Sequence, residues 1–364
     1  MARHRNRRFR SAVALGLGLG FVGQVQAAPE PNSLPHRIME GYPEEMAIAL
    51  NQHERDLRAL VERKALDGTY SLIIPATRRW DPGSTLDVAF NGGSPALYAQ
   101  IESAAQAWTA PGVANIKLRF RDAAGAWNVW STLDQTHRAE IRIAFGPTGQ
   151  WSAVGKGSID RTLPGGKPHE ASMNLEGFDE RLPPDWKGVV RHEFGHALGF
   201  QHEHQSPAGA CDFRYFDDRD YKRQVDSEGW FRVDDWGRRP GLYTFLGGKA
   251  NRWGKRRVDE NMKPIKTSSA YDVGPFDKHS IMKYYFDSWQ FEGGEESGCF
   301  TKQNAEDLSP GDIAGARRAY PSNGRASAEI ILRNSQTLKD VQAADRAPSR
   351  LKASMAERLN LVTQ

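Results

Sequence analysis

The sequence predicts an α+β domain, in which a sheet of short strands packs against helices. Three observations predict this class. Short segments that alternate between apolar and polar residues, as strands do, are frequent in the first half of the chain. One helical segment stands among them, and further helical segments follow. Hydrophobic residues make up 39% of the 364 residues, which is enough to build a core.

The N-terminus has the pattern of a signal peptide over residues 1–27. A basic stretch at Arg3–Arg10 precedes an apolar run at Ser11–Gly23, and Val25–Ala27 offers a cleavage site. The run is shorter than the roughly 20 residues that span a bilayer. We therefore expect a secreted or periplasmic protein without stable membrane insertion. The alternative is a basic tail that binds nucleic acid.

The charge of the mature chain argues against a nucleic-acid partner. The formal net charge is +4, but residues 1–27 hold five Arg and no acidic residue, so the remaining chain carries −1. The mean hydropathy of −0.64 excludes an integral membrane protein.

The chain divides into four parts by pattern. After the signal, residues 28–69 form an N-terminal extension or a removable pro-segment, with a predicted helix at Glu44–Lys64. Residues 70–321 form the compact domain, and residues 322–364 form a frayed or helical tail. The expected strands or extended pieces of the compact domain are Thr85–Phe90, Ile116–Phe120, Ala139–Phe145, Trp151–Ile159 and Ala171–Leu175. The expected helices begin at Pro95, at Trp186 with Asp185 as N-cap, and at Pro310 within a Ser309–Asp312 capping box.

A cluster of histidines predicts a catalytic zinc site. His192 and His196 are four residues apart, so on a helix their rings project from one face and can bind one ion. His202 would point away on a continued helix, since six residues turn it by about 600°. Gly199 permits the positive φ that ends the helix and brings His202 back. Three protein ligands leave one position open, as in catalytic zinc sites.

Glu193, which directly follows the first ligand, has the position of a general base. From there its carboxylate can take a proton from the water that zinc activates as this water attacks a carbonyl carbon. The alternative is a set of ordinary surface or core histidines. Four of the ten His fall within residues 192–204, with Glu and Gly at the required places, which favours the metal site.

The same residues resemble the metzincin zinc proteases, whose signature adds a Met-turn downstream. The segment His279–Tyr285 resembles the S-x-M-x-Y turn of astacin-like enzymes. This resemblance implies that Met282 forms an apolar floor under the zinc. It also implies that Tyr284 is a mobile fifth ligand that stabilises the transition state. For Tyr284 the alternative is a core aromatic residue.

Further motifs extend the resemblance to about Trp80–Tyr320. Trp151–Gly155 resembles the W-S-x-V-G strand of astacins, and Ala171–Leu175 stands where these enzymes have their edge strand. His202–Pro207 reads H-E-H-Q-x-P, as in bacterial members. Glu203 corresponds to the acidic residue that contacts the trimmed N-terminus in astacins, or it is a solvated charge.

The resemblance implies a two-lobed catalytic domain with a twisted mixed sheet, an active-site helix and an irregular lower lobe that ends in a helix. It also implies an endopeptidase that acts on a protein or peptide as a monomer. The chain lacks the F-x-G-D motif of the pro-segment and has only two cysteines. In an exported chain, Cys211 and Cys299 predict one disulfide, with two free thiols as the alternative.

Three alternatives remain open. A zinc-stabilised binding or adhesion protein that has lost catalysis would keep the histidines but would not need Glu193. An enzyme of the same kind could act on a cell-wall peptide or on one specific protein. The acidic residues between Asp212 and Asp220 suggest either a calcium site or a solvated loop, and they lack the EF-hand spacing. His204 is expected beside the metal site or at the surface and not as a ligand.

Overall fold

The structure is a computed structural model, which describes residues 42–64, 77–209, 211–227, 229–249, 251–265, 273–345 and 347–362. Contacts divide the chain into two units, residues 1–37 and 38–364. The first unit, and with it the predicted signal peptide, lies outside the described residues, as does the expected start of the compact domain near Tyr70.

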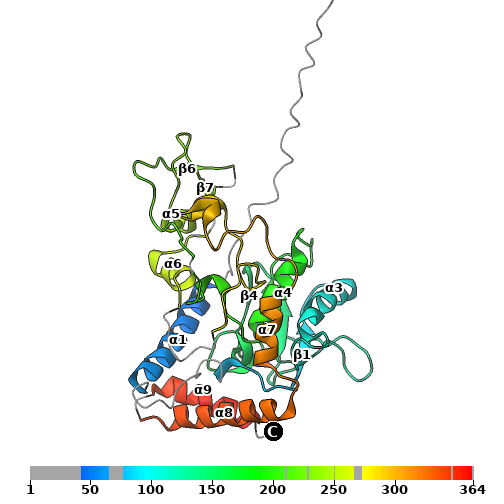
Figure 1. Cartoon of the computed structure of the whole chain (residues 1–364). Coiled ribbons are helices and arrows are strands. Elements are labelled where there is room, and N and C mark those ends of the chain that lie inside the picture. Colours follow the sequence, from blue (N-terminus) through cyan, green and yellow to red (C-terminus); the bar gives the residue numbers. More distant parts are fainter. Residues whose placement is uncertain are drawn as a thin grey trace, which may run out of the picture. The chain divides into compact units, whose positions relative to one another are not determined.

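The second unit contains the helices and strands of Figure 1. Its α-helices are α1 (Glu44–Lys64), α3 (Pro95–Ala105), α4 (Trp186–Ala197), α5 (Leu242–Gly247), α6 (Lys255–Met262), α7 (Pro310–Ala319), α8 (Gly324–Ala343) and α9 (Ser349–Val362). Its strands are β1 (Thr85–Phe90), β2 (Lys117–Arg119), β3 (Ile141–Ala144), β4 (Gln150–Ser152), β5 (Met173–Leu175), β6 (Gln224–Val225) and β7 (Phe231–Arg232). Its 3₁₀ turns are η2 (Gln106–Thr109), η3 (Gly155–Ile159), η4 (Glu203–Gln205), η5 (Ser288–Gln290) and η6 (Gly294–Glu296).

The α+β prediction is confirmed by a five-stranded mixed sheet in the order β2-β1-β3-β5-β4. The first four strands of this order run parallel, and β4 pairs antiparallel with β5 at the edge. The main core joins the sheet to α3, α4 and α7. Alternating burial in β1, where Leu86 and Val88 point into this core, matches the alternation in the sequence.

The predicted edge strand is wrong. Met173–Leu175 pairs with β3 on one side and with β4 on the other, so it is an inner strand. Its residues are all buried, as expected for an inner strand. The edge strand on this side of the sheet is β4, which contains Trp151. The chain leaves the strand at Ser152 and forms the 3₁₀ turn η3, so the extended piece expected at Trp151–Ile159 is shorter than predicted.

Helix ends agree with the predictions at two of three places. Ser94 caps α3 by accepting from Leu97 N, and Ser309 and Asp312 form the predicted capping box of α7. Asp185 stands at the N-cap position of α4, but its side chain makes no capping hydrogen bond. It accepts instead from the Asn304 amide at 3.3 Å, which draws the carboxylate toward another loop.

The C-terminal segment is helical and belongs to the fold. Helices α8 and α9 lie side by side and α1 packs against α9, as Figure 1 shows. The three helices share a core of their own. It consists of Leu57, Leu60, Leu338, Val341, Ala344, Ala347, Leu351 and Met355, with Leu359 partly buried against it. The prediction of a helix at Glu44–Lys64 is confirmed with the same bounds.

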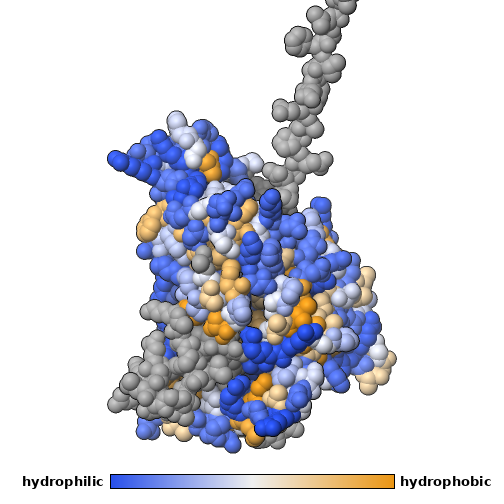
Figure 2. Space-filling model, viewed as in Figure 1, coloured by the Kyte–Doolittle hydropathy of each residue, from blue (hydrophilic) through white to orange (hydrophobic). Residues whose placement is uncertain are grey.

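The surface in Figure 2 is mainly hydrophilic, and its hydrophobic residues form small separate patches. The arm with β6 and β7 is almost entirely hydrophilic in this view. Among the described residues, no helix combines the length and the apolar character needed to cross a membrane.

Candidate metal centre

The turn after α4 has the geometry that the third ligand requires. Gly199 adopts a φ of 95°, a left-handed conformation that residues with a Cβ rarely adopt. Its amide donates to His196 O at 2.7 Å, and Phe200 N donates to Gly195 O at 3.0 Å. This pair of bonds is a Schellman motif. It ends the helix and lets the chain carry His202 back toward the helical histidines.

The three predicted ligands converge in one place. A nitrogen of each of His192, His196 and His202 lies within 4.8 Å of the others. His196 Nε2 is 3.1 Å from His192 Nε2 and 3.1 Å from His202 Nε2. Two nitrogens on a tetrahedral zinc ion, each bound at about 2.0–2.1 Å, are roughly 3.3 Å apart. The spacing therefore fits zinc.

The remaining ring nitrogens fix the tautomers. His192 Nδ1 is 2.7 Å from Ile281 O, and His196 Nδ1 is 2.8 Å from Phe200 O. A carbonyl accepts hydrogen bonds, so both Nδ1 atoms carry the proton and both Nε2 atoms present a lone pair. Lone pairs that face each other at this distance repel unless a cation lies between them. The donor set therefore fits a metal ion.

Burial keeps the ligands in the neutral form that binds metal. His192 is 8% exposed and His202 is 6% exposed. Burial, and secondly the neighbouring His196, lower the pKa of both rings well below the usual value. Both imidazoles are thus neutral at neutral pH and can coordinate a metal without releasing a proton.

The Met-turn lies directly under α4. Met282 is 3% exposed, and a Cβ on Gly195 would overlap its sulfur and lie 2.9 Å from Trp108 Cζ2. Gly195, between the two helical ligands, is therefore the residue that admits the methionine. Ile281 O, one residue earlier, orients His192. The predicted floor under the ligands is present.

Asp312 of α7 holds the Met-turn in place. One carboxylate oxygen accepts from Ser280 Oγ at 2.6 Å, and the other accepts from Ile281 N at 2.8 Å and from Ser309 N at 2.8 Å. Sequence reasoning identified Asp312 as part of a capping box but missed this second role. Its only signal was the unusual choice of Asp at a position where Glu or Gln is common.

Tyr284 stands beside the ligands, and His204 stands behind it. The Tyr284 ring centre is 4.3 Å from that of His202 and 4.8 Å from that of His204. His204 Nε2 is 2.9 Å from Asn261 O, and burial lowers the pKa of His204 to about 3. Among the described residues the metal-binding group contains only the three predicted histidines, so His204 is a buried neighbour of the site.

Glu193 lies on α4 directly after His192 and is 3% exposed. Burial of a carboxylate costs free energy unless the group is hydrogen-bonded or paired with a charge. Its place in the helix agrees with the predicted general base.

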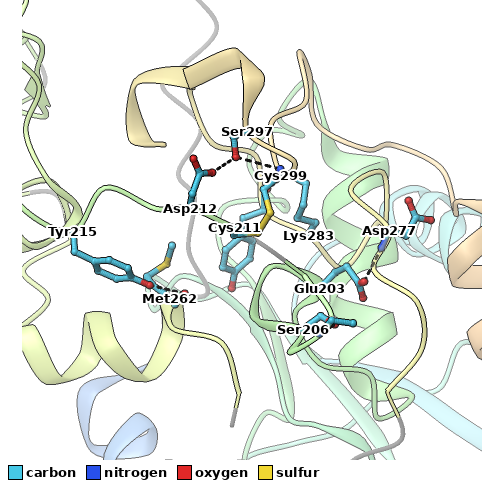
Figure 3. The surroundings of a disulfide bond; sticks show 12 residues. Glu203, Ser206, Cys211, Asp212, Tyr215, Met262, Asp277, Lys283, Ser297 and Cys299 are labelled. Atoms are coloured by element: carbon cyan, nitrogen blue, oxygen red, sulfur yellow. Dashed lines mark hydrogen bonds between the residues drawn. A yellow bond between two sulfur atoms is a disulfide. The ribbon is translucent and has the colours of Figure 1, made fainter. Parts of the chain in front are cut away.

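Glu203 borders a cavity that also reaches the Met-turn. The cavity has a volume of about 450 Å³ and includes Ser280, Met282 and Asp312 in its lining. One Glu203 oxygen accepts from Asp277 N at 2.9 Å, as Figure 3 shows. Glu203 is partly buried, and this burial raises its pKa to about 7.

The predicted disulfide is present between Cys211 and Cys299, whose Cα atoms are 5.1 Å apart (Figure 3). Beside it, Asp212 accepts from the Ser297 hydroxyl and from Gly293 N. The bond lies in a second core, which is built from Phe213, Trp230, Leu242, Phe245, Leu246, Trp253, Val258, Met262, Phe286, Phe291 and Cys299. It closes the segment between residues 211 and 299, which contains β6, β7, α5 and α6.

The acidic residues of this region serve the protein's own donors. Asp218 accepts from Arg214 and Arg239, and Asp217 accepts from Gly241 N. No further metal-binding group occurs among the residues that the structure describes. The solvated or hydrogen-bonded loop is thus the better interpretation of this segment.

Comparisons with known proteins add a limited likeness. No protein-family model and no curated protein matches the chain. A solved structure of myroilysin is 26% identical, with a TM-score of 0.48 over 68% of this chain and 97% of that one. A second myroilysin structure is 24% identical, with a TM-score of 0.39 over 67% and 86%.

The third similar structure is high choriolytic enzyme 1, a hatching-enzyme zinc protease from the medaka fish Oryzias latipes. It is 18% identical, with a TM-score of 0.36 over 66% of this chain and 94% of that one. With TM-scores below 0.5, the case for function rests on the site itself.

Proposed function

We propose that the protein is a secreted zinc-dependent endopeptidase in which His192, His196 and His202 hold the metal. The observation that carries the proposal is the convergence of three buried Nε2 atoms, two of them fixed as lone-pair donors by carbonyls on their Nδ1 side. Three histidine ligands that leave a fourth position open are typical of catalytic zinc. The Cys211–Cys299 disulfide supports export, since such bonds persist in oxidising compartments.

In this proposal each nearby residue has a separate task. Zinc, when bound, would polarise the scissile carbonyl and make water a stronger acid. Glu193 takes the proton of the attacking water and passes it to the leaving amine. Tyr284, whose ring lies against His202, donates a hydrogen bond to the oxyanion. Met282 and Asp312 position the histidines and do not take part in proton transfer.

The first experiment measures zinc content and hydrolysis of a peptide library in one preparation. We expect one zinc ion for each chain and cleavage that a chelator abolishes and added zinc restores. Glu193→Gln should keep the zinc and lose at least about 100-fold in kcat, the smaller end of the range for general acid–base catalysis. The matched control is Glu180→Gln, which changes an exposed carboxylate in the same way. Full activity of Glu193→Gln would show that the proposed base is wrong.

Tyr284→Phe tests the second catalytic residue. The variant removes only the hydroxyl, so zinc content and KM should stay near their wild-type values. We expect kcat to fall by about 10²–10³, as on removal of one oxyanion donor. An unchanged kcat would leave Tyr284 as a packing residue, which was the alternative at the sequence level.

The second candidate function is a zinc-stabilised binding or adhesion protein. The feature that favours it is the exposure of Phe216 and Trp236 in the segment closed by the disulfide, because exposed aromatic side chains are typical of binding surfaces. Glu193 weighs against it, because a structural zinc site needs no buried carboxylate beside a ligand. A zinc-loaded protein that cleaves no peptide in a broad library would favour this alternative.

A further inference from the structure

Helix α1 borders the metal centre. A cavity of about 130 Å³ lies between α1, which contributes Asn51, Glu54 and Arg55, and the metal-binding rings of His196 and His202. A cavity of about 150 Å³ holds one benzene-sized molecule. The space beside the zinc ligands therefore fits about one side chain, and α1 forms its outer wall.

The first set of contacts that holds α1 in place joins it to α6 and to the segment before β1. On α6, Glu260 accepts from Asn51 Nδ2 at 2.7 Å and from Arg55 Nη1 at 2.7 Å. Toward the sheet domain, Glu54 pairs with Arg78 at 3.0 Å, and both side chains are at most 15% exposed. Helix α1 is thus held both to α6 and to Arg78, which precedes β1, and Figure 1 shows α1 next to α6.

The second anchor lies at the edge of the sheet. The Tyr42 hydroxyl donates to Ser152 O of β4, and the Tyr42 ring lies 5.6 Å from that of Trp151. Arg257 of α6 donates to Tyr42 O at 3.1 Å. Tyr42, which lies two residues before the start of α1, is therefore fixed both to the edge strand and to α6.

The third anchor is apolar and argues that α1 is permanent. Leu57 is 0% exposed and Leu60 is 4% exposed, and both lie in the core that α1 shares with α8 and α9. Arg350 of α9 also donates to Asp56 of α1 at 2.6 Å. Loss of α1 would expose the apolar faces of two further helices to water. A removable pro-segment would not be expected to complete the core of the part it leaves behind.

The polar groups of the cavity indicate which side chain fits. Its lining holds Arg55, Arg58, Arg78 and Arg358 against Glu54 and Glu260, so it carries two more positive than negative charges. Asn51 adds an amide with both a donor and acceptors. A short side chain with hydrogen-bonding groups matches these walls, whereas Lys or Arg would meet like charge and an aromatic ring would leave the polar groups of the wall unpaired.

We propose that α1 is retained in the mature enzyme and builds a specificity pocket next to the scissile bond, which takes a short polar side chain that is not cationic. The proposal rests on the proposed function, because it assigns a subsite of that same active centre. Asn51 and Arg55 are specificity-determining residues, and they touch the substrate without taking part in the chemistry.

The test is a cleavage profile of a peptide library combined with the intact mass of the active species. We expect the active species to contain residues 42–64. We also expect one position next to the cleaved bond to favour Ser, Thr, Asn or Asp over Phe, Trp, Lys and Arg by about tenfold or more, the size of one pocket contact.

Two variants separate the pocket from the general stability of α1. Arg55→Ala enlarges the cavity and should relax the preference at that single position, with other positions unchanged. Arg350→Ala removes another anchor of α1 that does not line the cavity, and it should leave the profile as in the wild type. Urea unfolding of both variants shows that each is folded.

The outcomes are distinct. An active species that lacks residues 42–64, or the same profile for Arg55→Ala and the wild type, overturns the pocket while peptide hydrolysis still supports the proposed function. Zinc-loaded protein that hydrolyses no peptide refutes the proposed function and the pocket with it.

Discussion

Gly195 offers a sharp test of how the metal centre is built. An Ala in the interior of a helix usually stabilises a protein by about 0.5–1 kcal/mol over Gly, because it restricts the unfolded chain. At Gly195, however, the new Cβ would overlap Met282 Sδ and approach Trp108 Cζ2 to 2.9 Å. Both neighbours are at most 3% exposed, so neither can move without disturbing the core. Overpacking of this kind costs about 1–3 kcal/mol.

The matched control is Gly315→Ala in α7. Gly315 is also an interior helical glycine, but a Cβ there would meet no heavy atom within 4 Å. Gly315→Ala should therefore raise the free energy of unfolding by about 0.5–1 kcal/mol, the difference in helix propensity between Ala and Gly. The difference in free energy of unfolding between the two variants equals the packing term alone, which is about 1–3 kcal/mol.

Urea unfolding of both variants in the absence of metal measures this difference. A zinc titration against a chromophoric chelator then measures the effect on the site. We expect weaker zinc binding only for Gly195→Ala, because Met282 and the adjoining Ile281 carbonyl must shift. Equal unfolding midpoints for the two variants, with unchanged zinc affinity, would refute the argument that Gly195 exists to admit the methionine.

Three further predictions concern the disulfide, the Met-turn and acid stability. Replacing Cys211 and Cys299 with Ser should lower the free energy of unfolding by about 4–5 kcal/mol, the value of the chain-entropy model for a separation of 88 residues. A loss below about 1 kcal/mol, measured by urea unfolding, would contradict this prediction. Asp312→Asn should cost about 1–3 kcal/mol and raise the dissociation constant for zinc, because the carboxylate oxygens accept bonds that an amide cannot all replace. Burial and, secondly, the charge of Arg358 lower the pKa of His53 from 6.5 to about 3 in the folded protein. As the pH falls, His53 is therefore protonated in the unfolded chain before it is protonated in the folded protein. The free energy of unfolding of the wild type should therefore fall between pH 6.5 and pH 3. Unfolding measured at each pH should show a smaller fall for His53→Gln, and an equal fall would contradict the assignment to His53.

The metal ligands could be predicted because their arrangement is local. His192, His196 and His202 lie within eleven residues, and one helix, one left-handed glycine and one turn fix their rings. Met282 and Tyr284, which are distant from the histidines in the sequence, could be predicted only from the resemblance of their segment to a Met-turn. The choice of the edge strand failed for the opposite reason. Each strand is visible as a pattern in the sequence. The order of the strands depends on pairing between distant segments, so the local sequence of β4 or β5 does not say which of them lies at the edge.

The role of α1 shows where sequence reasoning ends. Its amphipathic pattern predicts a helix at Glu44–Lys64, and that helix is present, but the pattern does not say what the apolar face contacts. The answer involves α6, α8 and α9, through contacts such as Arg55–Glu260 that span 205 residues of sequence. A removable pro-segment and a permanent wall would show the same amphipathic helix in the sequence. They differ in whether the catalytic unit keeps a complete core without it. Because Leu57 and Leu60 are buried against two C-terminal helices, the structure favours the wall, and the intact mass of the active species decides between the two.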